Sequence, residues 1–197
     1  MKKLTFALLF IMLCMVMCGC NTTPDVKAGE KVFIDKEEFD GSYAELSFEL
    51  AEDFYSSDES YSGVCRFGIY DSENQLIASC PFNSAALAGN FHSVIFIQEN
   101  NEENLNTGVT FVKDSVLSCV KTEVENKTHY VLYAVYQIKG KDYVSFYCYH
   151  ENELRPIGNT DTEISDDFAH KEGQTFYDSE LNKTFVVDIA THSLEVE

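Results

Sequence analysis

Hydrophobic and polar residues alternate along much of the chain with a period of two. Between Ala44 and Leu50, apolar residues occupy every second position and Glu45, Ser47 and Glu49 lie between them. A strand with one buried face requires this alternation. Ser42-x-x-Glu45 also matches a helix capping box, so a helix is the alternative here. Similar patterns predict further strands over Ser62–Tyr70, Gln75–Cys80, Phe91–Gln98, Val109–Lys113, Val116–Val124, Thr128–Ile138, Asp142–His150, Gln174–Tyr177 and Thr184–Ala190.

Short turn sequences separate these strands, among them Asp71–Asn74, Glu125–Lys127, Lys139–Lys141 and Ser179–Asn182. No long helical pattern interrupts the series of strands. We therefore predict an all-β fold, a single antiparallel β-sandwich or open barrel-like domain. A partial β-propeller-like meander is the alternative, but the chain has too few strands for the roughly four blades that are typical.

The first twenty residues have the layout of a signal peptide. Lys2 and Lys3 precede an apolar run of 15 residues from Leu4 to Cys18. As a helix this run is about 22 Å long, shorter than the roughly 30 Å hydrocarbon core of a bilayer, so an uncleaved spanning anchor is the weaker interpretation. A secreted protein without an anchor is a further alternative.

Met17-Cys18-Gly19-Cys20 resembles the lipobox of bacterial lipoproteins, in which a small residue precedes a lipid-modified Cys. The resemblance implies cleavage before Cys20 and attachment of lipid to that Cys, which would anchor the protein to the cell membrane, facing outside the cytoplasm. It divides the chain into a signal peptide over 1–19, the lipidated Cys and a tether over 20–30, and one β-rich extracytoplasmic domain over 31–197.

Removal of residues 1–19 leaves 12 basic and 33 acidic residues, a formal charge of −21. Nucleic-acid binding is excluded by this balance, because phosphate contacts need clustered Lys and Arg and the chain has only Arg66 and Arg155 as arginines. We interpret the acidity as a solvated, self-repelling surface.

Four cysteines remain beyond Cys20. If Asp71–Asn74 forms a four-residue hairpin loop, Cys65 lies directly opposite Cys80, and a disulfide between them is predicted in an oxidising compartment. Cys119 and Cys148 fall on the outer strands of a three-strand meander, beyond bridging distance, and are interpreted as buried small apolar side chains.

An acidic stretch near the C-terminus supplies oxygen ligands for a hard cation in what is predicted to be a loop. Its carboxylates are those of Asp161, Glu163, Asp166 and Asp167, which form a candidate Ca²⁺ site. Ile164 occupies the position where an EF-hand-type loop has Gly. A solvated acidic loop is therefore the alternative.

Tyr143, Tyr147 and Tyr149 share one face of a predicted strand through their even spacing. If that face is exposed, these stiff amphipathic side chains form a candidate platform for binding a protein or a glycan. Burial in the core is the alternative. Depending on whether the turn at Lys139–Lys141 closes with three residues or two, the neighbouring strand adds either Tyr133 or the pair Tyr130 and Tyr136.

Sequence signatures of catalysis are absent: there is no G-x-S-x-G, H-E-x-x-H or glycine-rich phosphate loop, and no C-x-x-C after the signal peptide. The five histidines lack i, i+2 and i, i+4 spacing, so tertiary contacts alone could assemble a zinc site. Cys–His catalysis would require Cys119 or Cys148 to meet a histidine.

These features favour a non-enzymatic, lipid-anchored module that binds a protein, peptide or cell-wall ligand and needs no cofactor. A small cell-envelope hydrolase and a Ca²⁺-dependent structural or adhesive domain are the alternatives.

Overall fold

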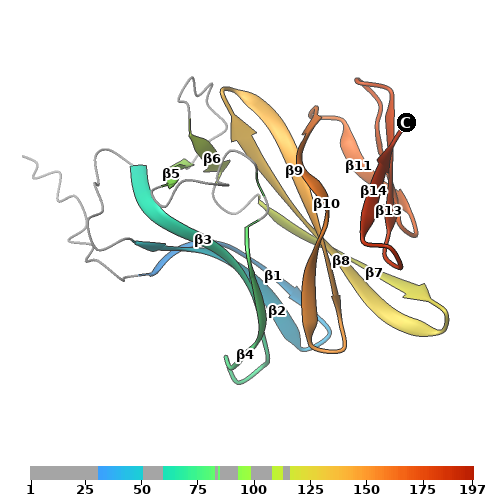
Figure 1. The fold of residues 1–197 in the computed structure, drawn as a ribbon, viewed down its shortest axis with the longest axis horizontal. Coiled ribbons are helices and arrows are strands. Elements are labelled where there is room, and N and C mark those ends of the chain that lie inside the picture. Colours follow the sequence, from blue (N-terminus) through green and yellow to red (C-terminus); the bar gives the residue numbers. More distant parts are fainter. Residues whose placement is uncertain (1–30, 51–59, 83, 85–92, 99–107, 113–115) are drawn as a thin grey trace, which may run out of the picture.

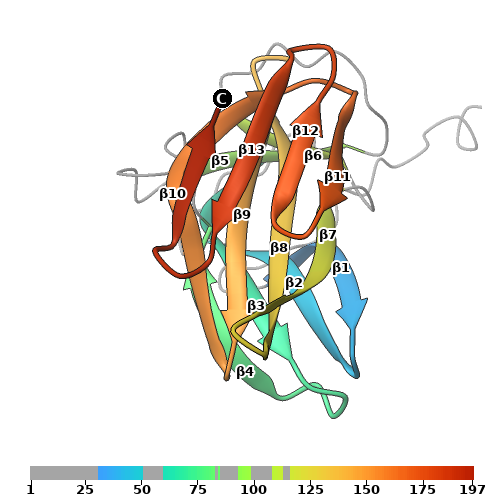
Figure 2. The ribbon, with the colours of Figure 1, turned by 90° about the vertical axis from the view of Figure 1, so that its right-hand side faces the viewer.

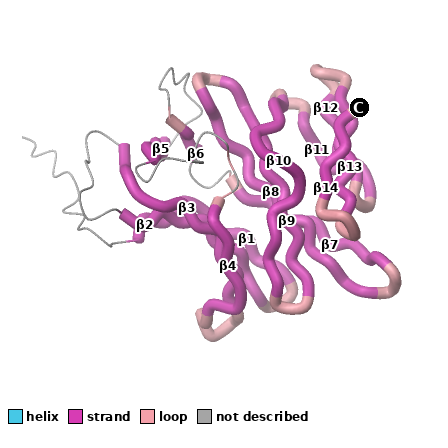
Figure 3. The backbone as a smooth tube through the Cα atoms, in the orientation of Figure 1, coloured by secondary structure: helices cyan, strands magenta, loops and turns pink. Residues whose placement is uncertain are grey.

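The computed structural model describes residues 31–50, 60–82, 84, 93–98, 108–112 and 116–197. The lipobox resemblance and Cys20 lie outside these residues. Figure 3 shows strands joined by turns throughout the described part and no helix. Accordingly, the described residues contain no helix long and apolar enough to cross a membrane.

The described strands form two sheets, and the all-β prediction is confirmed. Ten strands make the larger sheet: β1 (Lys31–Phe39), β2 (Ser42–Leu50), β3 (Ser60–Tyr70), β4 (Leu76–Pro81), β5 (Ser93–Gln98), β6 (Val109–Val112), β7 (Leu117–Val124), β8 (Lys127–Ile138), β9 (Lys141–His150) and β10 (Glu153–Ile164). Four strands make the smaller sheet: β11 (Phe168–Glu172), β12 (Thr175–Asp178), β13 (Lys183–Asp188) and β14 (Ser193–Val196).

The larger sheet runs in the order β1-β2-β3-β5-β6-β8-β9-β10, with β4 added beside β3 and β7 beside β8. The first part of β3 pairs with β5 and its last part pairs with β4. Neighbours are antiparallel except for β5 and β6, which are parallel. Neither sheet closes into a barrel, and the arrangement is consistent with a β-sandwich.

Three layers result from this topology (Figure 1). The larger sheet supplies two of them, because β1–β4 pack against β7–β10 across the first hydrophobic core. The smaller sheet covers the other face of β8–β10 across a second core. In Figure 2 the smaller sheet lies in front of these strands.

The middle layer is therefore buried on both faces. In β9 all six residues from Val144 to Tyr149 are buried. Tyr147 belongs to the first core and its neighbours Phe146 and Cys148 belong to the second. Such a strand is an almost continuous apolar run rather than an alternating one, as the sequence V-S-F-Y-C-Y is.

A two-residue turn sets the register between β8 and β9. Lys139 and Gly140 both have positive φ, 54° and 73°, as a type I′ hairpin requires. Ile138 consequently pairs with Lys141, which confirms the two-residue alternative for this turn. The meander β7-β8-β9 that was predicted for Cys119 and Cys148 is also confirmed.

The register predicted for Cys65 and Cys80 is wrong. Cys80 pairs with Phe67, and Cys65 pairs with Phe48 on β2. Tyr70 pairs with Leu76, so the turn has five residues rather than four. Inside it, the Asp71 carboxylate accepts hydrogen bonds from the backbone N–H groups of residues 73 and 75, at 2.9 and 2.8 Å. A bulge in β3–β4 adds a second shift. Both thiols are free in this structure.

The stretch from Ala44 to Leu50 is a strand, as the alternation indicated, and the capping-box alternative is wrong. By contrast, the acidic stretch predicted to be a loop lies largely in β10, which carries a bulge between Ile157 and Thr162. β1 was not predicted, because a bulge between Phe33 and Asp35 interrupts its alternation.

Candidate functional site

The tyrosine face of β9 is not an exposed platform. Tyr147 is fully buried and stacks on Phe67 of β3, with ring centroids 4.5 Å apart. Tyr149 is buried as well, and Tyr143 is half-buried against the same core. The β1–β4 layer covers these side chains, so the alternative of burial in the core is confirmed and Tyr143, Tyr147 and Tyr149 form no exposed binding platform.

The four predicted cation ligands are directed to different partners. Asp161 accepts a hydrogen bond from the Tyr136 hydroxyl, and Glu163 forms an ion pair with Lys141 at 2.9 Å. Asp167 accepts a hydrogen bond from the Ser179 hydroxyl at 2.6 Å. Asp166 is exposed at the mouth of a pocket of about 280 Å³ beside β11. As placed in the described ranges, no three His, Cys, Asp or Glu residues are grouped to hold a metal ion.

A different surface carries the exposed apolar side chains. We call the side of β1–β4 that points away from the first core the outer face. Of the four large hydrophobic side chains that are exposed in the described residues, three lie on it: Phe33 (45% exposed), Val64 (44%) and Leu76 (55%). The fourth, Val196, lies on the smaller sheet.

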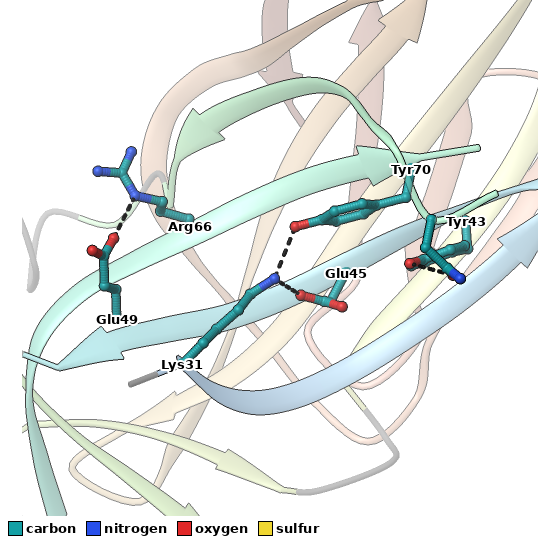
Figure 4. A network of polar contacts seen from close by, with 7 residues as sticks. Lys31, Tyr43, Glu45, Glu49, Arg66 and Tyr70 are labelled. Carbon is teal, nitrogen blue, oxygen red and sulfur yellow. Dashed lines mark hydrogen bonds and ion pairs between the residues drawn. The ribbon is translucent and has the colours of Figure 1, made fainter. Parts of the chain in front are cut away.

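Two tyrosines stack at one end of this outer face, where β2 begins and β3 ends. The Tyr43 and Tyr70 rings are 5.1 Å apart and nearly parallel, at 10°. Tyr70 lies over Gly68, where an added Cβ would come within 2.9 Å of the ring. Glycine at that position therefore lets the ring lie along the sheet. The Lys31 ammonium donates a hydrogen bond to the Tyr70 hydroxyl at 2.8 Å, as Figure 4 shows.

The charged side chains of the outer face are matched with one another. Lys31 pairs with Glu45, and Arg66 pairs with Glu49 at 3.3 Å (Figure 4). At the edge of the face, Lys36 pairs with Glu38 at 2.8 Å, and its ammonium lies 4.3 Å from the Tyr43 ring centroid. The outer face is therefore locally balanced in charge, although the whole chain carries −19.

A second site lies between the middle layer and the smaller sheet. His129, Cys148, His150 and His192 line one pocket of about 150 Å³, together with Ile189 and the Glu153–Arg155 pair. The strand pairing that ends at Tyr130 and Tyr149 puts His129 directly opposite His150, and their rings stack with centroids 3.9 Å apart. We call this set of four residues the histidine pocket.

The protonation of the histidine pocket follows from its surroundings. Burial lowers the pKa of His129, and the nearby His150 and Lys127 lower it further. Burial also raises the pKa of Cys148 to about 11, although Arg155 opposes this shift. The Cys148 Sγ lies 3.8 Å from His129 Nδ1. At neutral pH the thiol is therefore protonated, which disfavours a Cys–His nucleophile here.

The turn between β8 and β9 could have predicted from the sequence that His129 lies opposite His150. A two-residue turn at Lys139–Gly140 places His129 opposite His150 by counting along the strands, as it does for the tyrosines. His192 could not be found in this way, because it reaches the pocket from the turn between β13 and β14 in the other sheet. The chain matches no protein-family model, no curated protein and no solved structure.

Proposed function

We propose that this protein is a lipoprotein, anchored outside the cytoplasmic membrane through Cys20, which binds another protein through the outer face of β1–β4. One observation carries the proposal: three of the four exposed large hydrophobic side chains in the described residues lie on that face, which also carries the stacked Tyr43 and Tyr70. Tyrosine supplies a large, stiff contact area with little loss of conformational entropy.

The chemistry of the outer face selects the kind of partner. Its charges are already paired, so a strongly charged ligand would gain little and would have to break those pairs. An apolar protein surface with few charges would instead cover Phe33, Val64 and Leu76 and remove them from water. A second copy of the chain is disfavoured, because two domains of charge −21 repel each other.

The proposed anchor limits where the partner lies. Ten residues lie between Cys20 and Lys31, the first residue of β1. Fully extended, this tether spans about 40 Å at most. Since Lys31 belongs to the outer face, the binding surface would stay close to the lipid, and the partner would be a protein in or at the same membrane.

Comparison of matched variants tests this proposal. When partner protein is captured from the native membrane fraction, the Val64→Ser, Leu76→Ser double variant should retain about one tenth or less of the amount that the unaltered chain retains. The reason is that the double variant removes two apolar contacts. The control Val196→Ser makes the same change on the smaller sheet and should bind normally. Equal retention by both variants would contradict the proposal, provided that circular dichroism shows both folded.

A further inference from the structure

The histidine pocket brings together ligands that divalent zinc prefers. His129 comes from β8, Cys148 and His150 come from β9, and His192 comes from the β13–β14 turn. Imidazole nitrogen and cysteine sulfur are the usual ligands of Zn²⁺, whereas Ca²⁺ and Mg²⁺ prefer oxygen. We propose that the histidine pocket binds one Zn²⁺ ion through these four side chains.

The first two ligands already lie close to the required spacing. In a tetrahedral site with Zn–S near 2.3 Å and Zn–N near 2.0 Å, a sulfur and a nitrogen are roughly 3.5 Å apart. The Cys148 Sγ and His129 Nδ1 are 3.8 Å apart. Both atoms belong to adjacent strands of a rigid sheet, so a shift of a few tenths of an ångström completes this half of the site.

His150 is oriented as a zinc ligand is. Its Nδ1 lies 2.8 Å from the carbonyl oxygen of Thr128, which can only accept, so Nδ1 carries the proton. Metal-bound histidines commonly donate their second ring N–H to a carbonyl in this way. The buried Nε2 lies 3.2 Å from the Glu151 carboxylate, so a proton held between these two atoms would have to leave when Nε2 binds the ion.

Ring rotation supplies the remaining change. As described, the two imidazoles stack at 23° to each other, and no three side chains yet converge on one point. Directly opposed residues on antiparallel strands have Cβ atoms about 5 Å apart, so both side chains can reach one ion. Binding then requires the His129 ring to tilt out of the stack about its Nδ1, while His150 keeps its contact with the Thr128 carbonyl. The His192 carbonyl accepts a hydrogen bond from the Gly158 N–H at 3.1 Å, so rotation about its side-chain torsions would have to bring its ring to the ion.

Cobalt titration of the full-length protein in detergent tests the proposal directly. Co²⁺ occupies zinc sites and reports tetrahedral nitrogen and sulfur ligands through visible bands and a near-ultraviolet thiolate-to-cobalt band. We expect saturation at one Co²⁺ per chain and loss of the spectrum when Zn²⁺ is added. Cys148→Ser should abolish the thiolate band, and His192→Asn should weaken Co²⁺ binding by at least about tenfold.

Matched controls are available on the same chain. Cys119 lies on the opposite face of the middle layer, and His170 lies on the smaller sheet away from the pocket, so Cys119→Ser and His170→Asn should leave the titration unchanged. His192 has φ of 54°, a conformation that Asn accepts, so its variant should melt like the metal-free parent.

A titration without saturation would overturn the proposal. So would a spectrum that persists in both Cys148→Ser and His192→Asn, or one that the two controls weaken equally. These outcomes leave binding by the outer face untouched, because the histidine pocket lies on the other side of the middle layer.

Discussion

The Asp35 carboxylate accepts a hydrogen bond from the backbone N–H of Val116 at 2.8 Å and a second from Leu117 at 2.7 Å. Asp35 is buried on β1, whereas the two donors lie at the start of β7. These strands are distant along the pairing path of the larger sheet, and the carboxylate joins them where its two layers meet. The buried Asp35 side chain therefore connects β1, at the edge of the first layer, to β7 of the middle layer through two hydrogen bonds.

Replacing Asp35 with Ala should lower the free energy of unfolding by about 2–5 kcal/mol. The variant leaves two backbone N–H groups buried without acceptors, and each costs about 1–3 kcal/mol. Urea unfolding measures the change. The control Glu38→Ala alters an exposed carboxylate on the same strand and should stay within about 0.5 kcal/mol of the parent. Equal effects of the two variants would contradict the role given to Asp35.

Gly158 allows β10 and β14 to approach closely. Its φ is +68°, and an added Cβ would lie 2.8 Å from the Leu194 Cβ. Gly158→Ala should therefore cost about 2–4 kcal/mol through strain and overpacking. Gly173 is the matched control: its φ is +55°, but nothing lies within 4 Å of the added Cβ. Its Ala variant should cost only about 1–2 kcal/mol. Thermal unfolding distinguishes the two, and a larger loss at Gly173 would contradict this explanation.

Asp178 should make the free energy of unfolding fall at acid pH. Burial raises the pKa of its carboxyl, but the hydrogen bonds from Leu181 and Ser165 outweigh burial and lower the pKa overall. A lowered folded-state pKa adds stability above the unfolded value of about 3.9, and this stability is lost as the pH falls through the folded value. Asp178→Asn should therefore reduce the loss of stability between about pH 5 and pH 2.

Asp142 provides a control of opposite sign. Burial raises the pKa of its carboxyl, and Asp166 nearby raises it further. Ionisation of Asp142 therefore destabilises the folded state once the pH rises above the pKa of this carboxyl in the unfolded chain. Asp142→Asn should raise the free energy of unfolding more at neutral pH than at acid pH. Urea unfolding at several pH values measures both variants. The same pH dependence in both would contradict these assignments.

The period-two pattern was sufficient to predict an all-β protein, because most strands have one face against a core. It could not identify the layer that covers the other face of β9. The strand's own sequence places Tyr143, Tyr147 and Tyr149 together, but their burial depends on Phe67 and other residues of the β1–β4 layer. Long-range packing therefore decided whether the tyrosines bind a ligand or form the core.

Local irregularities account for the remaining errors. The bulge between Ile69 and Tyr70 moved Cys80 away from Cys65, and no signal in the alternating pattern marks it. The outer face was missed for a related reason, because Phe33 lies on a strand whose alternation is interrupted two residues later. A bulge changes the register by one residue, which moves every following side chain to the other face.

All four cysteines of the described residues should be free thiols that react slowly in the native protein. Burial raises the pKa of Cys80 and Cys119 to about 12, and that of Cys65 further. Thiolate is therefore scarce at pH 8. Without reductant, a disulfide-exchange reagent should titrate four thiols after unfolding of the mature chain. A count of two would contradict the free thiols and restore the Cys65–Cys80 bridge.

Site-specific crosslinking is the sharpest test of recognition through the outer face, because it reports what touches each surface in the native membrane. A photoreactive amino acid at position 64 or 76 lies on the outer face, and one at position 196 lies on the smaller sheet with similar exposure. We predict that positions 64 and 76 form a covalent adduct with the same membrane-associated protein and that position 196 does not. Adducts at position 196 alone, or equally at all three positions, would contradict recognition through the outer face.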